Sequence, residues 1–304
     1  MYEKKTVWPV MLTPFTESGE IDFHALAALI QWYEENGVDG LFAVCQSSEM
    51  FFLSLRERLE IVRFIKKHAS VPVIASAHIS DGREDQLDEL LRVSDAGADA
   101  VVLLTNRMAR RGESGAVWMK NLEWLLDRLP DSVPLGLYEC PYPYKWLLSE
   151  EELRFCRDSG RFLFLKDTCC DLSTIQKRTE LLAGSRLGLY NANSATLLDS
   201  LRCGAAGFSG VMANFHPDLY VWLVHNWDKE PEKAEILQSA LTVCSFSESR
   251  PYPVTAKYHL QKIGLPIHTY TRSRSSLEVA DLVRSEIDQM DRLIRFTAES
   301  LGIK

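Results

Sequence analysis

The feature that most constrains the fold is an alternation of short apolar runs with longer amphipathic segments over the first 230 residues of the chain. Eight such runs are rich in Val, Leu and Phe, and they occur at residues 7–13, 40–45, 71–77, 98–104, 133–138, 161–166, 186–191 and 205–212. Consecutive apolar residues are typical of strands that are buried on both faces of a parallel sheet. The runs therefore predict eight parallel strands.

The segments between these runs have helical spacing. Within residues 54–67, apolar side chains recur on one helical face, at Leu55, Leu59, Val62 and Ile65. Similar patterns predict helices at residues 23–35, 84–95, 116–128, 149–157, 172–182 and 194–202.

Three junctions, at residues 36–40, 96–100 and 203–207, place a Gly just after a predicted helix and just before a strand. Gly readily adopts the left-handed conformation that ends a helix, so these junctions are interpreted as helix-to-strand turns. Eight strands with intervening helices predict an α/β fold of the (β/α)8 (TIM) barrel type. A doubly wound sheet is the alternative, but the chain has no GxGxxG after the first strand and no P-loop.

After about residue 228 the pattern becomes purely helical. Two helical segments are followed by a long final one, roughly residues 275–300. These segments exceed what eight barrel units need. We therefore expect a catalytic barrel over residues 1–228 and an appended C-terminal helical region over residues 229–304.

Composition excludes several classes of protein. The 304 residues are 46% hydrophobic and 25% charged, which is typical of a folded domain and not of a disordered chain. A net charge of −8 argues against non-specific electrostatic binding to nucleic acid or to an anionic membrane. No apolar run approaches the ~20 residues of a membrane span, and no signal peptide is visible. Seven scattered cysteines indicate reduced thiols, so we expect a cytoplasmic protein.

Lys166 ends the apolar run at 161–166, and Tyr138 ends the run before it. Reactive groups of a barrel lie where the strands end, so these two side chains are expected to project beside each other. Burial disfavours a charged lysine, and a neutral amine attacks a carbonyl to form a Schiff base, with a neighbouring phenol to carry protons. Alternatively, Lys166 pairs with Asp167 or reaches solvent, and Tyr138 is a core-edge aromatic.

A polar turn follows the second apolar run, with Gln46, Ser47 and Ser48 in sequence. Its hydroxyls and backbone amides suit a carboxylate, which needs several charge-assisted donors. An ordinary helix-capping turn has the same composition. His78, at the end of the third run, has no visible partner and is interpreted as a loop histidine.

These residues resemble the dihydrodipicolinate synthase and N-acetylneuraminate lyase family of class I, Schiff-base aldolases. The resemblance covers nearly the whole chain, in an ordered set of motifs: TPF at 13–15 with Gly19 and Asp22, the segment Gly40–Glu49, Tyr138 in YECP, Lys166 in FLKDT, and the stretches 198–214 and 251–265. It implies that Lys166 forms an imine with a 2-oxo acid, usually pyruvate, and that Tyr138 relays protons. The family is usually tetrameric, so we expect a homo-oligomer, either a tetramer or a dimer.

The chain also departs from the family pattern. The GTTGE-like carboxylate loop of the family is CQSSE at residues 45–49, which keeps one hydroxyl at Ser47 and has lost both glycines. The tyrosine that follows the fourth strand of the synthase is absent from LLTNRMARRG, and only Lys145 stands near the position of its arginine after the fifth strand. These departures argue against a true dihydrodipicolinate synthase and leave the identity of the 2-oxo acid open.

We therefore predict a lyase or aldolase that joins or cleaves a pyruvate-like 2-oxo acid and an aldehyde through a Schiff base on Lys166, with Tyr138 as the proton shuttle. The turn at residues 46–48 and the backbone around Ser209 are expected to hold the carboxylate. No cofactor and no metal are expected, because the iminium is itself the electron sink. Two alternatives stay open: an imine-dependent hydratase or dehydratase, and a non-catalytic barrel that binds an oxo acid.

Overall fold

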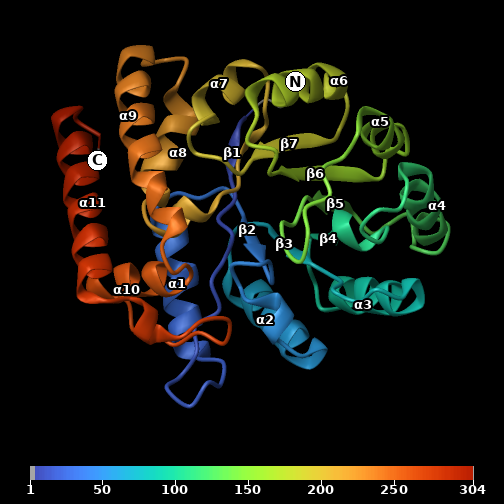
Figure 1. The fold of residues 1–304 in the computed structure, drawn as a ribbon, viewed down its shortest axis with the longest axis horizontal. Helices are drawn as coiled ribbons and strands as arrows, with labels where there is room; N and C mark the ends of the chain where they lie inside the picture. Colours follow the sequence, from blue (N-terminus) through green and yellow to red (C-terminus); the bar gives the residue numbers. More distant parts are fainter. Residues whose placement is uncertain (1–3, 304) are drawn as a thin grey trace.

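The computed structural model describes residues 4–303, in which eight parallel strands form one curled sheet with helices around it (Figure 1). The strands are β1 (Thr6–Val7), β2 (Leu41–Ala43), β3 (Val73–Ser76), β4 (Ala100–Leu104), β5 (Leu135–Tyr138), β6 (Phe162–Asp167), β7 (Gly188–Asn191) and β8 (Gly207–Phe208). Each strand overlaps one of the eight apolar runs, so the predicted strands are confirmed.

The sheet closes on itself. Hydrogen-bonded neighbours follow the order β1-β8-β7-β6-β5-β4-β3-β2, and the chain just after β1 returns to β2 through a parallel bridge between Val10 and Phe42. Met11 N–H donates to the carbonyl of Phe42 at 2.9 Å, and Phe42 N–H donates to that of Pro9 at 3.0 Å. The (β/α)8 barrel is therefore confirmed, and the alternative of a doubly wound open sheet is wrong.

Eleven helices are described within residues 4–303. They are α1 (Phe23–Glu35), α2 (Leu55–His68), α3 (Arg83–Asp95), α4 (Gly115–Leu126), α5 (Glu150–Asp158), α6 (Leu172–Leu182), α7 (Leu197–Arg202), α8 (Pro217–Asn226), α9 (Pro231–Cys244), α10 (Val254–Lys262) and α11 (Asp281–Ser300). Short 3-10 helices are η1 (Met50–Phe52), η2 (Thr105–Arg107), η3 (Val211–Asn214), η4 (Ser245–Ser249) and η5 (Ser276–Glu278).

Local sequence explains where these elements begin and end. Ser54 caps α2, because its hydroxyl accepts the N–H of Glu57 while the Glu57 carboxylate accepts the N–H of Ser54. The predicted helix-to-strand turns are confirmed at Gly37, Gly97 and Gly204, whose φ angles are 76°, 101° and 104°. Such angles strain any residue with a Cβ, so glycine sets the end of each helix there.

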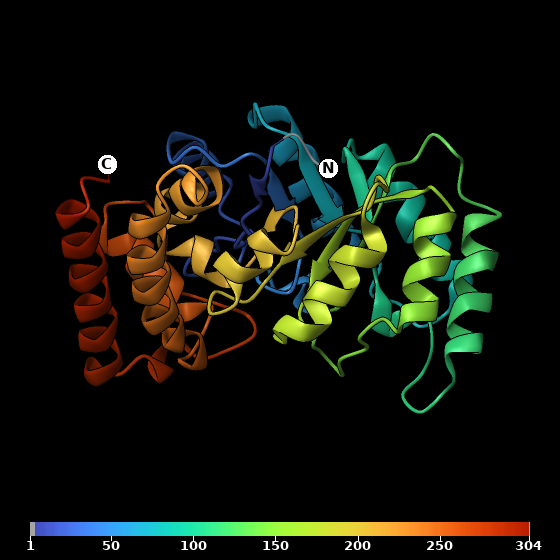
Figure 2. The same ribbon diagram turned by 90° about the horizontal axis from the view of Figure 1, so that it is seen from above.

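Helices α9 to α11 extend the barrel on one side, with α11 at the outer edge of the molecule beside α9 (Figures 1 and 2). The predicted final helix at 275–300 starts later than expected: Ser275 caps the 3-10 turn η5, and α11 begins only at Asp281. The division at residue 228 stays a prediction, and its outer ends, residues 1–3 and 304, lie outside the described residues. No helix within the described range is long and apolar enough to cross a membrane.

Candidate active site

A pocket of about 570 Å³ lies where the strands end at their carboxyl side. Its walls come from the turns after β2, β5, β6, β7 and β8 and from segments near the C-terminus. The polar side chains that line it include Gln46, Ser47, Glu49, Tyr138, Lys145, Lys166, Thr168, Cys170, Asn193, Glu248, Tyr252, Ser273 and Arg274.

Tyr138 and Lys166 lie side by side at the base of this pocket, as their positions at the ends of adjacent runs predict. They are direct partners in the parallel register of β5 and β6, and the Lys166 Nζ atom lies 5.3 Å from the centre of the Tyr138 ring. Both side chains are almost completely buried, with 3% of Lys166 and 5% of Tyr138 exposed. Neither residue reaches bulk solvent, so both would act in a medium of low polarity.

The surroundings of Lys166 raise the neutral fraction of its amine above that of an ordinary lysine. Burial lowers the pKa of Lys166 from 10.5 to about 8, against the weaker opposing effect of the nearby Cys45 and Glu248. Its Nζ donates a hydrogen bond to the carbonyl oxygen of Ser209. The alternative in which Lys166 pairs with Asp167 is wrong, because the Asp167 carboxylate pairs with Arg178 instead.

Tyr138 keeps its proton at neutral pH. Burial, followed by the neighbouring Cys140 and Cys45 side chains, raises the pKa of Tyr138 well above 10. A protonated phenol can donate to an oxygen that is leaving a carbon atom. Beside it, the Cys140 thiol donates to Oε1 of Gln46 at 3.4 Å, which holds the Gln46 amide at the wall of the pocket.

The structure separates the two serines of the predicted carboxylate turn. Ser47 lines the pocket, whereas Ser48 is absent from its described lining. The Ser48 hydroxyl donates to the carbonyl of Met11 at 2.6 Å and accepts the N–H of Cys45 at 3.1 Å, so it stabilises the turn itself. The turn begins at Val44 in a left-handed conformation, with φ of 49°, which is rare for a β-branched residue and marks a strained backbone.

Glu49 ends this turn and fastens a distant segment over the pocket. Its carboxylate accepts the backbone N–H groups of Arg272 at 2.7 Å and Ser273 at 2.8 Å, and it pairs with the buried Lys257 at 3.2 Å. This anchoring brings Ser273 and Arg274 to the mouth of the pocket. Burial also lowers the pKa of Lys257 to about 8, although Glu49 opposes the shift.

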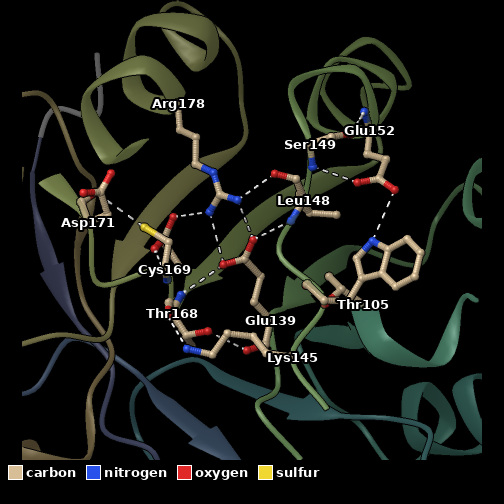
Figure 3. Close-up of polar contacts among 12 residues, drawn as sticks. Thr105, Glu139, Lys145, Leu148, Ser149, Glu152, Thr168, Cys169, Asp171 and Arg178 are labelled. Atoms are coloured by element: carbon tan, nitrogen blue, oxygen red, sulfur yellow. Dashed lines mark hydrogen bonds and ion pairs between the residues drawn. The ribbon is translucent and has the colours of Figure 1, made fainter. Parts of the chain in front are cut away.

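A buried ion-pair network joins the residues that follow Tyr138 and Lys166 in the chain, and Figure 3 shows its centre, Arg178 and Glu139. Arg178, from α6, bonds Glu139 at 2.8 Å and also pairs with Asp167, and these carboxylates follow Tyr138 and Lys166 in the chain. Glu139 further accepts the N–H of Leu148 at 2.8 Å and that of Thr168 at 3.1 Å. Burial and the Asp167 charge raise the pKa of Glu139, and Arg178 opposes that rise. The ends of β5 and β6 are thereby clamped together.

Sequence reasoning missed the pocket residues contributed by the C-terminal part, among them Glu248 on η4 and Tyr252. Burial raises the pKa of Glu248 from 4.5 to about 7, with the charge of Lys166 opposing, and its Oε1 is buried with no hydrogen-bond partner. The Tyr252 hydroxyl accepts from the Asn214 side chain at 2.8 Å. Both residues belong to the helical C-terminal part, where no pattern in the sequence indicates that the chain returns to the barrel mouth.

His78 does not line the pocket, which agrees with its interpretation as a loop histidine that takes no part in catalysis. It is completely buried, and its Nε2 accepts the N–H of Leu104 at 3.1 Å. Burial lowers the pKa of His78 to about 3, so the ring is neutral across the physiological range.

Comparison with known proteins gives a consistent result. A sequence model of the dihydrodipicolinate synthetase family matches residues 3–281. The 4-hydroxy-tetrahydrodipicolinate synthase of Clostridium perfringens is 25% identical over 264 residues, which are 84% of this chain and 87% of that protein.

Two solved structures share the fold. A dihydrodipicolinate synthase from Bacillus anthracis superposes with a TM-score of 0.86 at 21% identity, over 96% of this chain and 99% of its own. A prophage protein of the same family from E. coli, solved in complex with pyruvate, has a TM-score of 0.83 at 23% identity and covers 99% of both chains. The barrel, the family match and the relatives agree: this chain belongs to the dihydrodipicolinate synthetase family of class I aldolases and lyases.

Proposed function

We propose that this protein makes or cleaves a carbon–carbon bond between a pyruvate-like 2-oxo acid and an aldehyde, through an imine on Lys166. The observation that carries the proposal is the buried Lys166, with its pKa lowered to about 8, next to the protonated phenol of Tyr138 in the pocket lining. The E. coli relative solved with pyruvate supports this class of substrate.

The first step is attack of the neutral Lys166 amine on the carbonyl carbon. With a pKa of about 8, about a tenth of the side chain is neutral at pH 7, whereas an ordinary lysine would be almost entirely charged. Attack gives a carbinolamine, and the leaving hydroxyl takes a proton as it departs as water. Tyr138 is the donor in place for that proton.

The second step uses the iminium as an electron sink. It draws electrons from the adjacent carbon, so that a bond from that carbon to hydrogen, or to the aldehyde carbon, breaks and leaves an enamine. When the bond to hydrogen breaks, the Tyr138 phenolate left by the first step takes the proton. In the condensation direction the enamine attacks the aldehyde, whose oxygen takes a proton. Glu248, with its pKa of about 7 and an unpartnered oxygen, is a second group in the pocket that can exchange that proton. Water then releases the product from Lys166.

We assign the substrate carboxylate to the Gln46 amide and the Ser47 hydroxyl. Both line the pocket, and both offer donors. Ser209 has a different place in the proposal, because its carbonyl accepts from Lys166 and its hydroxyl donates to the carbonyl of Trp8 at 2.9 Å. A carbonyl oxygen repels a carboxylate, so Ser209 orients the lysine.

We infer that the aldehyde differs from that of the curated synthases. Residues 105–112 after β4 contain no tyrosine, and Lys145 stands after β5 where the synthase pattern has an arginine. The Lys145 Nζ donates to the carbonyl of Thr168 at 2.8 Å, which holds its positive charge at the pocket wall, whereas the guanidinium of Arg274 at the mouth is paired with Glu278 at 2.9 Å. One compact ammonium is a poorer match than a guanidinium for a second carboxylate on the aldehyde.

We also propose a cytoplasmic homo-oligomer, a dimer or a tetramer. All seven cysteines are free thiols, which suits a reducing compartment. Large apolar side chains are exposed on the C-terminal helical region, among them Phe246, Leu282 and Phe296, at 71%, 71% and 69%. Light scattering on a sizing column tests the assembly, and a monomer at all concentrations would contradict it.

The test of the proposed function is proton exchange at the carbon next to the carbonyl of pyruvate and of other 2-oxo acids, followed by proton NMR in deuterium oxide. Enamine formation exchanges those protons without any aldehyde. The wild type should exchange at least one acid, and Lys166→Ala should exchange none. Failure of the wild type with every acid tested would contradict the imine and support a non-aldolase barrel.

A further inference from the structure

A second cluster of chemically active side chains lies outside the pocket, where the C-terminal helices meet the barrel. His216 directly precedes α8, His259 lies on α10, and Asp291 lies on α11. Their ring nitrogens and carboxylate oxygens come within 4.8 Å of one another. None of the three residues lines the 570 Å³ pocket, so the cluster has no part in the proposed reaction.

The cluster contains buried polar atoms that have no partner. Both histidines are completely buried. Both ring nitrogens of His216, Nδ1 of His259 and Oδ1 of Asp291 lack a hydrogen bond within the described structure. A buried polar atom without a partner costs free energy, so several of them on three residues whose ligand atoms gather within 4.8 Å indicate that something binds between them.

The tautomer of His259 leaves a lone pair available on Nδ1. Its Nε2 lies 3.0 Å from the carbonyl oxygen of Phe215. A carbonyl only accepts, so Nε2 carries the hydrogen and Nδ1 has a free lone pair. Histidines that bind metal ions characteristically donate their other N–H to a backbone carbonyl in this way. The His216 ring lies 5.3 Å from the His259 ring, edge to face.

The charges around the cluster favour a cation. Arg295 bonds the Asp218 carboxylate at 2.6 Å and lies 3.8 Å from that of Asp291. One guanidinium therefore faces two carboxylates, and the histidines add no charge when they are neutral. Lys262 on α10 also faces His259, but it is paired with Asp288 at 2.7 Å. The group as a whole therefore keeps a net negative charge that a divalent cation would neutralise.

We propose that His216, His259 and Asp291 form a binding site for a divalent transition-metal ion, with Zn²⁺ as the best fit. Two imidazoles and one carboxylate are a donor set that zinc prefers, with water in the fourth position. Tetrahedral zinc places its ligand atoms about 3.3 Å apart, so the side chains draw closer when the ion binds. Asp291 is able to do so because its side chain is 21% exposed on the outermost helix.

The bound ion would cross-link the start of α8 to α10 and α11. These elements belong to different parts of the chain, and α11 is the last helix, at the edge of the molecule (Figure 1). A ligand that binds only the folded state stabilises it, so zinc is expected to raise the melting temperature.

The experiment is titration of chelator-treated full-length protein with Zn²⁺, and separately with Co²⁺, whose visible absorption reports four-coordinate geometry. The wild type should bind one ion per chain at this site and melt at a higher temperature with zinc. Asp291→Asn and His259→Gln should each lose affinity by more than the about 10- to 100-fold that an outer-shell partner contributes. His24→Gln, which removes an exposed imidazole, should bind as the wild type does.

Two results would overturn the proposal. One is the absence of both zinc binding and a rise in melting temperature in the wild type. The other is zinc binding that Asp291→Asn leaves unchanged, since the ion would then lie elsewhere, for example on the cysteines. Asp291→Asn keeps the size of a partly exposed side chain, so this variant decides the question even if His259→Gln does not fold.

Discussion

Lys166 and Tyr138 are paired in the register of adjacent strands, and the residues that follow them, Asp167 and Glu139, share one guanidinium, that of Arg178. The two groups proposed to do chemistry therefore face the pocket, while the next residue on each strand is tied into a buried network behind. Arg178 on α6 thereby fixes the spacing between the Lys166 amine and the Tyr138 phenol. The residues that position the two groups are distinct from the groups themselves.

Arg178→Ala should destabilise the fold strongly. It leaves the Glu139 and Asp167 carboxylates buried, each 0% exposed, without their cation. Breaking such a network costs about 3–5 kcal/mol of the free energy of unfolding, measured by denaturant titration. The matched control is Arg157→Ala, whose partner Asp158 is largely exposed, and it should cost less than about 1 kcal/mol. Equal losses in the two variants would contradict the clamp.

Lys166→Met should stabilise the protein near neutral pH. Because the folded pKa of about 8 lies below the ordinary 10.5, the folded state binds fewer protons than the unfolded state between those values, and stability rises with pH there. Below pH 8 the buried lysine thus lowers the free energy of unfolding of the wild type by up to about 3 kcal/mol, and the variant, which has no charge to bury, regains it. The gain should shrink as the pH approaches 10.5. Denaturant titrations at several pH values measure it, and a less stable variant at pH 7 would refute the lowered pKa.

The same pKa predicts a pH dependence of imine formation. Only the neutral amine attacks, so the exchange rate at limiting substrate should rise about tenfold per pH unit below pH 8 and level off above it. A rate that kept rising to pH 10 would indicate an ordinary lysine.

Ser47→Ala and Ser48→Ala should have different effects although the residues are adjacent. Loss of the Ser47 hydroxyl removes a charge-assisted hydrogen bond to the substrate carboxylate, so KM for the 2-oxo acid should rise about 10- to 100-fold. It also removes a bond to Tyr252, so the variant should lose less stability than Ser48→Ala, whose hydroxyl has two partners. Loss of the Ser48 hydroxyl, which bonds Met11 and Cys45, should lower the free energy of unfolding by about 1–3 kcal/mol. Steady-state kinetics and denaturant titration on both variants separate these effects, and the reverse pattern would contradict the assignment.

Glu248→Gln should lower kcat for the carbon–carbon step by about 100-fold, because the amide cannot exchange a proton with the aldehyde oxygen. The wild-type plot of kcat against pH should bend near pH 7, where Glu248 titrates, and this bend should be absent from the plot of the variant. Imine trapping should stay intact. A variant with the kcat and pH profile of the wild type would remove Glu248 from the mechanism.

The barrel could be predicted from sequence because each strand is buried on both faces, so its residues are apolar without interruption. The turns at Gly37, Gly97 and Gly204 could be predicted because only glycine readily ends a helix in that conformation. The position of Tyr138 beside Lys166 could be predicted because each residue ends one of two successive apolar runs. The register of the closing bridge between Val10 and Phe42 was not visible: both residues lie in predicted strands, but β1 ends at Val7 and only a single bridge joins the chain after it to β2.

The rest of the pocket depends on contacts between residues far apart in the chain. Ser47 and Ser48 are indistinguishable by type, and only the carbonyl of Met11 decides which one turns inward. Glu248 and Tyr252 follow helices that give no sign of returning to the barrel mouth. Lys257 is as buried as Lys166 and has a similar pKa, but its partner Glu49 is distant in sequence.

That similarity defines the most direct test. Incubation with a 2-oxo acid that exchanges, reduction with borohydride and peptide mapping by mass spectrometry should place one reduced adduct per chain on Lys166, with none on Lys257 or in the Lys166→Ala variant. An adduct on Lys257, or none with any 2-oxo acid, would contradict the account.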